Sequence, residues 1–134
     1  MNKEFHDKVA LIHVVDKKVV VALNKGSDAW FLPGGHREAG ESDEQTLVRE
    51  IKEELAVDIV PDTIEYEGAF EAQAHGSLPG SAARVTCYTA KFEGVPVASQ
   101  EIAKISFFAH DRVAEISAPT KLVFDELHRA GLIS

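Results

Sequence analysis

The residues best suited to chemistry are three glutamates, Glu50, Glu53 and Glu54. On a helix their side chains would share one face, because residues three and four positions apart are neighbours there. Like charges at these offsets destabilise a helix by ~0.2–0.5 kcal/mol per pair. A divalent cation would neutralise the acids, and carboxylates are ligands that Mg²⁺ prefers. The spacing therefore predicts a metal site on one helix face.

A helix that positions these glutamates is predicted from Asp43 to about Leu55. Ser42 and Gln45 have the spacing of a capping box, in which each side chain binds the backbone N–H of the other residue. With 100° between successive residues, one side of the helix carries an apolar stripe formed by Leu47, Val48, Ile51 and Leu55. The glutamates lie on roughly the opposite side, so we expect them to face solvent.

The rest of the chain alternates apolar runs with turn residues. Residues 9–15 and 19–23 are predicted to pair as a hairpin, and residues 30–32 to form a short strand that ends in a turn at residues 33–35. Further strands are predicted over residues 64–74, 85–92 and 102–109. A second amphipathic helix is predicted over residues 120–130, with Leu122, Val123, Phe124 and Leu127 facing inward.

The small-residue loop 75–83 is expected to fold over a ligand. The order of strands and helices predicts one α/β or α+β sandwich domain over residues 1–134.

The amino-acid composition argues against some classes of binding partner. The chain has 134 residues, with 22 acidic and 14 basic residues and a formal net charge of −8. Binders of nucleic acid and of membrane surfaces carry basic patches, so this balance argues against both. No apolar run reaches the ~18 residues that a membrane helix needs. Because the single cysteine, Cys87, has no partner for an internal disulfide, a cytoplasmic location is expected.

A longer pattern surrounds the glutamates. Reading along the chain, its members are Gly35, Glu41, Arg49, Glu50, Ile51, Glu53, Glu54 and Val57. Together with the lead-in at residues 30–35, this spacing resembles the Nudix box of the Nudix (MutT-like) hydrolases, here residues 35–57. The last glycine of the family pattern is replaced by Ala56. Because that glycine helps to end the helix, we expect a small shift of the turn.

The resemblance implies a fold and a reaction. Nudix enzymes are α/β/α sandwiches with a mixed sheet, and they use Mg²⁺, or Mn²⁺ as an alternative, to hydrolyse a diphosphate linked to another group, commonly a nucleoside. Such a reaction requires neutralised phosphate charge and an activated water, and bound metal ions provide both.

The resemblance also implies roles for individual residues. Glu50, Glu53 and Glu54 would bind the metal and supply the catalytic base, which is Glu50 or Glu53. The carbonyl of Gly34 or Gly35 would be a further ligand. An ion pair between Glu41 and Arg49 would hold the loop of the box against its helix.

Other residues are weaker candidates for the site. Arg84, beside the loop 75–83, and Arg37, inside the box, could each bind a phosphate or be an ordinary surface arginine. Glu101 precedes the strand 102–109, a region from which many Nudix proteins supply one more acid, and the alternative is a surface acid. Trp30 and Phe70 could stack on a base, but we favour core packing for both.

We expect the small-molecule partner to be a nucleotide, specifically a (deoxy)nucleoside triphosphate. Subfamilies that prefer ADP-ribose or dinucleoside polyphosphates often carry Pro or Tyr beyond the box, and residues 72–75 contain neither. The alternatives are an ADP-ribose or nucleotide-sugar pyrophosphatase and a module of the same fold that senses a nucleotide without cleaving it. An isoprenoid diphosphate isomerase has little support from the lone Cys87. A homodimer is also expected.

Overall fold

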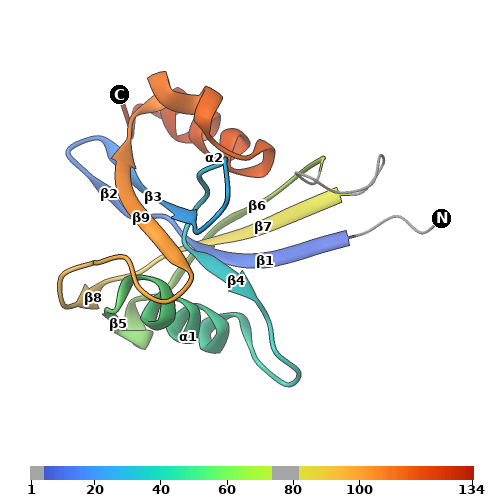
Figure 1. Ribbon diagram of the computed structural model, residues 1–134, viewed down its shortest axis with the longest axis vertical. Coiled ribbons are helices and arrows are strands. Elements are labelled where there is room, and N and C mark those ends of the chain that lie inside the picture. The colour runs from blue at the N-terminus through green and yellow to red at the C-terminus, as the bar shows by residue number, and fades with distance from the viewer. Residues whose placement is uncertain (1–4, 74–81) are drawn as a thin grey trace.

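Two helices enclose the β-sheets of the computed structural model, which describes residues 5–73 and 82–134 (Figure 1). Helix α1 (Asp43–Leu55) covers one side and α2 (Ala118–Arg129) the other. The α/β/α arrangement predicted from the resemblance is confirmed. Most of the predicted loop 75–83 lies outside the described residues, while its last two residues belong to strand β7. In the described residues, neither helix is long and apolar enough to cross a membrane.

The larger sheet is mixed and has β1 near its centre. Its order is β4-β1-β7-β6, built from β4 (Gly34–His36), β1 (Phe5–Leu11), β7 (Ala82–Thr89) and β6 (Glu65–Gln73). Strand β1 runs parallel to β7 and antiparallel to β4. A smaller antiparallel sheet has the order β2-β3-β9, from β2 (Val14–Val15), β3 (Lys18–Asn24) and β9 (Ile102–Phe108).

The remaining elements are short. Strands β5 (Asp58–Ile59) and β8 (Phe92–Glu93) pair with each other, and η1 (Pro61–Thr63) and η2 (His110–Glu115) are 3₁₀ helices.

The hairpin predicted between residues 9–15 and 19–23 is largely wrong. Strand β1 ends at Leu11 and pairs with β4 and β7 rather than with β3. Only the two residues of β2 pair with β3, across a tight turn in which Asp16 and Lys17 both have positive φ. Two buried apolar runs look alike in sequence whichever strand they pair with, so the pattern could not select the partner.

The short strand predicted at residues 30–32 is also displaced. Trp30 and Phe31 make only isolated bridges, and the regular strand is β4, which begins at Gly34. A Cβ atom on Gly34 would collide with the backbone of Val9 and Ala10. The sequence pattern suggested a turn at Gly34 and Gly35. In the structure, the missing side chain of Gly34 instead lets β4 lie close against β1.

Alternate residues of β1 supply two separate cores. Val9 and Leu11 pack with Leu47, Ile51 and Leu55 of α1, so the predicted apolar stripe of this helix is confirmed. Ala10 of the strand and Ile12, just after its end, face the other way, into a cluster with Val123 and Phe124 of α2. This is the two-residue period of a strand buried on both faces.

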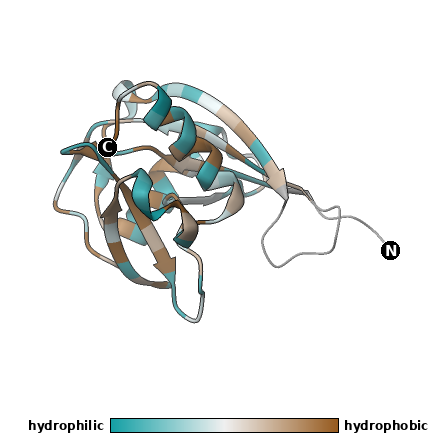
Figure 2. Ribbon diagram, turned by 90° about the horizontal axis from the view of Figure 1, so that it is seen from above, coloured by the Kyte–Doolittle hydropathy of each residue, from teal (hydrophilic) through white to brown (hydrophobic). Residues whose placement is uncertain are grey.

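The surface of α2 differs from the prediction at one position. Leu122 was expected to face inward but is exposed, while Val123 and Phe124 are fully buried. Hydrophilic and hydrophobic residues alternate along the helical ribbon nearest the viewer in Figure 2, as expected for an amphipathic helix. Trp30 and Phe70 pack against the α2 core, as predicted.

Candidate active site

Helix α1 begins and ends where the sequence predicted. The Ser42 hydroxyl accepts a hydrogen bond from the Gln45 backbone N–H at 3.1 Å, and the Gln45 side chain accepts one from the Ser42 N–H at 2.9 Å. This is the predicted capping box. At the other end, Ala56 adopts the left-handed conformation, with φ 58°. Ala56 thus takes the conformation that a glycine usually adopts at a helix end, and the small shift of the turn stays a prediction.

Three acids from two segments converge at one end of β4. Carboxylate oxygens of Glu50, Glu54 and Glu101 lie within 4.8 Å of one another. Glu50 and Glu54 project from α1, and Glu101 immediately precedes β9. Glu101 had only weak support from the sequence, because its distance in the chain concealed its proximity to the helix.

The three glutamates of the helix differ in how far their side chains are buried. Glu54 is 3% exposed and accepts a hydrogen bond from the Gly34 N–H at 2.8 Å, so the expectation that all three face solvent is wrong. Glu53 is about one-third exposed and lies 3.5 Å from Arg49 Nη1, outside the group of converging carboxylates.

The absence of a side chain at Gly35 leaves room for the Glu50 carboxylate beside β4. A Cβ atom at Gly35 would overlap the Glu50 carboxylate. Both Gly34 and Gly35 line the same hollow as the acids. The bare backbone of β4 therefore forms one wall of the acidic cluster.

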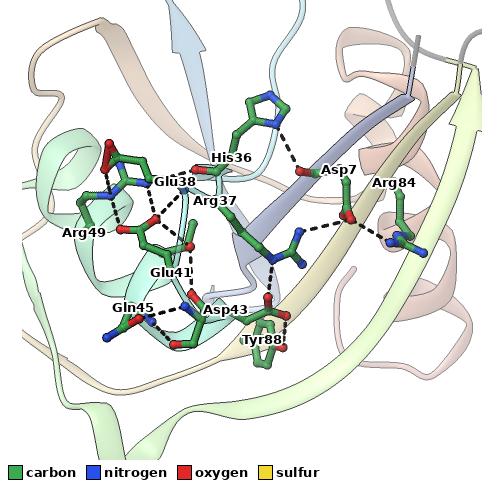
Figure 3. A network of polar contacts seen from close by, with 12 residues as sticks. Asp7, His36, Arg37, Glu38, Glu41, Asp43, Gln45, Arg49, Arg84 and Tyr88 are labelled. Carbon is green, nitrogen blue, oxygen red and sulfur yellow. Dashed lines mark hydrogen bonds and ion pairs between the residues drawn. The ribbon is translucent and has the colours of Figure 1, made fainter. Parts of the chain in front are cut away.

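Arg49 joins the loop of the box to the helix (Figure 3). Its guanidinium forms a bidentate pair with Glu41, with N···O distances of 2.7 and 2.8 Å, so the predicted ion pair is present. The same side chain bonds Glu50 at 2.6 Å and the His36 carbonyl at 3.0 Å. The Arg49 bond lowers the pKa of Glu41 to about 2. Arg49 therefore orients Glu50 while it anchors the preceding loop.

The two arginines predicted to bind substrate both pair with Asp7 of β1 (Figure 3). Arg84 Nη2 lies 2.7 Å from Asp7 Oδ2, and Arg37 Nη1 lies 3.2 Å from the same oxygen. Arg37 also pairs with Asp43, which accepts a hydrogen bond from the Tyr88 hydroxyl at 2.6 Å. These bonds join the box to β1 and β7, a structural role that the sequence did not reveal for Asp7 or Tyr88.

Two hollows adjoin beside the acidic cluster and share one wall. The acidic hollow has a volume of about 430 Å³ and contains Glu50, Glu54 and Glu101. The neighbouring apolar hollow, of about 230 Å³, reaches the start of α2 at Pro119 and Thr120. The residues that line both hollows are Lys8, Asn24, Phe31 and His36.

Lys8 and Asn24 were missed by the sequence analysis. Lys8 Nζ lies 4.4 Å from the centre of the Phe31 ring and donates to the Leu32 carbonyl at 3.4 Å. The Oδ1 atom of Asn24 is buried and has no hydrogen-bond partner. A lysine interrupting the start of a buried strand was the available signal for Lys8, whereas the end of β3 offered none for Asn24.

Burial shifts the pKa of two acids of the cluster, Glu50 and Glu54. Removal from solvent raises the pKa of Glu54 to about 8, against the opposing effects of Lys8 and the Gly34 N–H. Burial also raises the pKa of Glu50 and lowers that of Lys8. Carboxylates that resist ionisation without a counter-charge are suited to a divalent cation, which supplies that charge. The donor set, oxygen atoms alone, fits a hard cation such as Mg²⁺ or Mn²⁺.

Comparisons with known proteins show which family and which solved structures this chain resembles. A family model described as the NUDIX domain matches residues 4–127. The fold is similar to a MutT NUDIX hydrolase from Burkholderia pseudomallei, with 20% identity, a TM-score of 0.76 and coverage of 93% of this chain and 99% of that one. It is also similar to the ORF135 protein of E. coli, with 25% identity, a TM-score of 0.70 and coverage of 96% and 91%.

A UDP-X diphosphatase structure is a third similar fold, with 23% identity and a TM-score of 0.64, and the alignment covers 96% of this chain and 62% of that one. The comparison with curated proteins found no match.

Proposed function

Because the chain belongs to the NUDIX family and is a nucleotide pyrophosphohydrolase, we propose that it hydrolyses a (deoxy)nucleoside triphosphate with Mg²⁺, or Mn²⁺ in its place. The convergence of Glu50, Glu54 and Glu101 is the observation that carries this proposal. The two adjoining hollows support it, since one offers oxygen ligands near phosphates and the other offers apolar walls for a nucleoside.

In this proposal the metal ligands are Glu50, Glu54 and Glu101, with a carbonyl of Gly34 or Gly35. A bound divalent ion would neutralise phosphate oxygens and lower the pKa of water. Arg49 holds Glu50 in place through its 2.6 Å bond. Glu50 therefore acts as an oriented ligand in this proposal.

Glu53 is the base in this proposal and takes the proton of the attacking water. It stands outside the converging carboxylates and is partly exposed, so its oxygens are available to a water molecule. Arg49 Nη1, which also bonds Glu50, lies 3.5 Å from Glu53 Oε2 and holds this side chain near the cluster.

Arg37 and Arg84 have a smaller part in this proposal than the sequence indicated. Both are engaged with Asp7, and they support the wall of the site. Arg37 lines the acidic hollow and Arg84 the apolar one, so each can still contact substrate from its rim.

A second candidate function is hydrolysis of a nucleotide sugar or ADP-ribose. The similarity to a UDP-X diphosphatase favours it. A third, nucleotide sensing without cleavage, is disfavoured because every glutamate of the box is present. The proposal places the enzyme in the cytoplasm as a homodimer, with no nucleic-acid or membrane partner.

A screen for phosphate and pyrophosphate release separates these candidates. The chain is incubated with nucleoside triphosphates, nucleotide sugars and ADP-ribose, each with Mg²⁺, with Mn²⁺ and with a chelator. We expect metal-dependent cleavage of a triphosphate, and a loss of turnover by orders of magnitude in Glu53→Gln and Glu54→Gln. Glu44→Gln on the same helix, exposed and outside both hollows, is the matched control. Near-normal turnover in either test variant would contradict the assignment.

A further inference from the structure

The wall shared by the two hollows contains a lysine whose ammonium is only lightly engaged. Lys8 Nζ makes one long hydrogen bond, 3.4 Å to the Leu32 carbonyl, and lies over the Phe31 ring. An ammonium carries three donors. Across residues 5–73 and 82–134, no carboxylate forms an ion pair with Lys8 within 4.0 Å, although the charges of Glu54 and Glu50 act on it. At least one donor therefore remains for a ligand.

A second polar group on this wall also lacks a partner. Asn24 Oδ1 is buried without a hydrogen bond, and Asn24 lines both hollows. A buried acceptor without a partner is costly, by ~1–3 kcal/mol, unless a ligand or water satisfies it. Lys8 and Asn24 thus present a cationic donor and a neutral acceptor at one boundary.

The position of this boundary indicates which group of the substrate lies beside Lys8 and Asn24. Suppose that metal-bound phosphates occupy the acidic hollow and that the nucleoside occupies the apolar hollow. The phosphate attached to the sugar then lies at the boundary between them, beside the residues that line both hollows. Resting on the proposed function, we propose that Lys8 binds this sugar-linked phosphate and that Asn24 accepts a hydrogen bond from a sugar hydroxyl. An ammonium suits a phosphate oxygen, and an amide oxygen suits a hydroxyl donor.

The opposing explanation is that Lys8 serves only as a counter-charge for buried Glu54. In that case its removal would change metal binding and stability but not discrimination between a nucleotide and its nucleoside. The two roles therefore predict different results for a pair of ligands that differ only in the phosphate.

The experiment measures dissociation constants at saturating Mg²⁺ for the four deoxynucleoside monophosphates and their matching deoxynucleosides. The variants are Lys8→Met, which keeps the length of the side chain, and Lys8→Arg, which keeps the charge. The control is Lys91→Met, which removes the same charge from an exposed position outside both hollows. Mn²⁺ affinity and the melting temperature are recorded for each protein.

We expect Lys8→Met to weaken binding of the preferred monophosphate by about 10- to 100-fold, the range for a hydrogen bond to a charged group. Nucleoside binding should change by less than about threefold, Lys8→Arg should recover part of the loss, and Lys91→Met should match the parent. Asn24→Ala should weaken the nucleoside and the monophosphate equally.

An unchanged ratio of monophosphate to nucleoside affinity in folded Lys8→Met, with altered Mn²⁺ affinity, would overturn the inference in favour of the counter-charge. A parent chain that binds no monophosphate more tightly than its nucleoside would also overturn it. Failure of the proposed function is distinct, because the parent would then release no phosphate from any nucleotide in the screen.

Discussion

Replacing Gly35 by alanine should disable the site while leaving the fold intact. The three atoms nearest to a Cβ atom there would all belong to the Glu50 carboxylate, and the nearest would be 2.3 Å away. Gly35 is not one of the glycines with positive φ, so alanine fits the local backbone. The Glu50 carboxylate must then retreat by about 1 Å to reach the ordinary contact distance of about 3.5 Å.

The size of the effect follows from that displacement. A misplacement of about 1 Å in a group that positions reactants can cost on the order of 100-fold in rate. Glu50 would also leave the convergence with Glu54 and Glu101, so we expect weaker Mn²⁺ binding. Stability should change little, because the displaced group is the end of a flexible side chain and Gly→Ala at a compatible position contributes ~0.4–1 kcal/mol through the unfolded state.

The assay compares kcat at saturating Mg²⁺, Mn²⁺ affinity and urea unfolding for Gly35→Ala and Gly34→Ala. The neighbouring variant is the control for fold damage, since its Cβ atom would collide with the backbone of Val9 and Ala10 and should disrupt the β1–β4 pairing. The reasoning is refuted if Gly35→Ala keeps kcat within threefold of the parent, or if it loses as much stability as Gly34→Ala.

Three further predictions concern stability. Ile51→Ala should lower the free energy of unfolding by about 2–5 kcal/mol, because Ile51 is fully buried between α1 and β1, and a negligible loss in urea unfolding would mean that the helix face is assigned wrongly. Ala56→Gly should raise the free energy of unfolding by about 1 kcal/mol, because φ 58° strains a residue that has a Cβ atom, and an unchanged or lower melting temperature would show that no strain is present. Glu41→Gln should be less stable than the parent at neutral pH, and the two should converge as the pH falls from about 4.5 toward about 2, because the lowered pKa of Glu41 contributes stability only while the carboxylate is ionised. Denaturant titrations over that range that show a constant difference would contradict this origin.

Local features were predictable because their determinants lie within a few residues of one another. The capping box of Ser42 and Gln45 and the apolar stripe of α1 depend on a helical period of 3.6 residues. The ion pair between Glu41 and Arg49 spans eight positions and depends on a motif of fixed spacing. In each case the partners are brought together by one short element.

Pairing between distant segments was not predictable in the same way. The apolar run that begins at Val9 could not indicate that β1 lies between β4 and β7, because any buried strand presents a similar pattern. The exposed glutamate face of α1 was expected from periodicity alone. In the folded chain, β4 covers Glu54 on that face.

The amino-acid sequence by itself determined the helix that bears the acids, the loop that Arg49 anchors and the family to which both point. Only the tertiary structure decided that Glu101 joins Glu50 and Glu54, that Glu53 stays apart, and that Lys8 and Asn24 share a wall beside them. The physical reason is that a side chain acts on whatever lies within a few ångströms of it. Those neighbours come from β1, β3, β4 and the residue before β9, which only the packing of the sheets against α1 brings together.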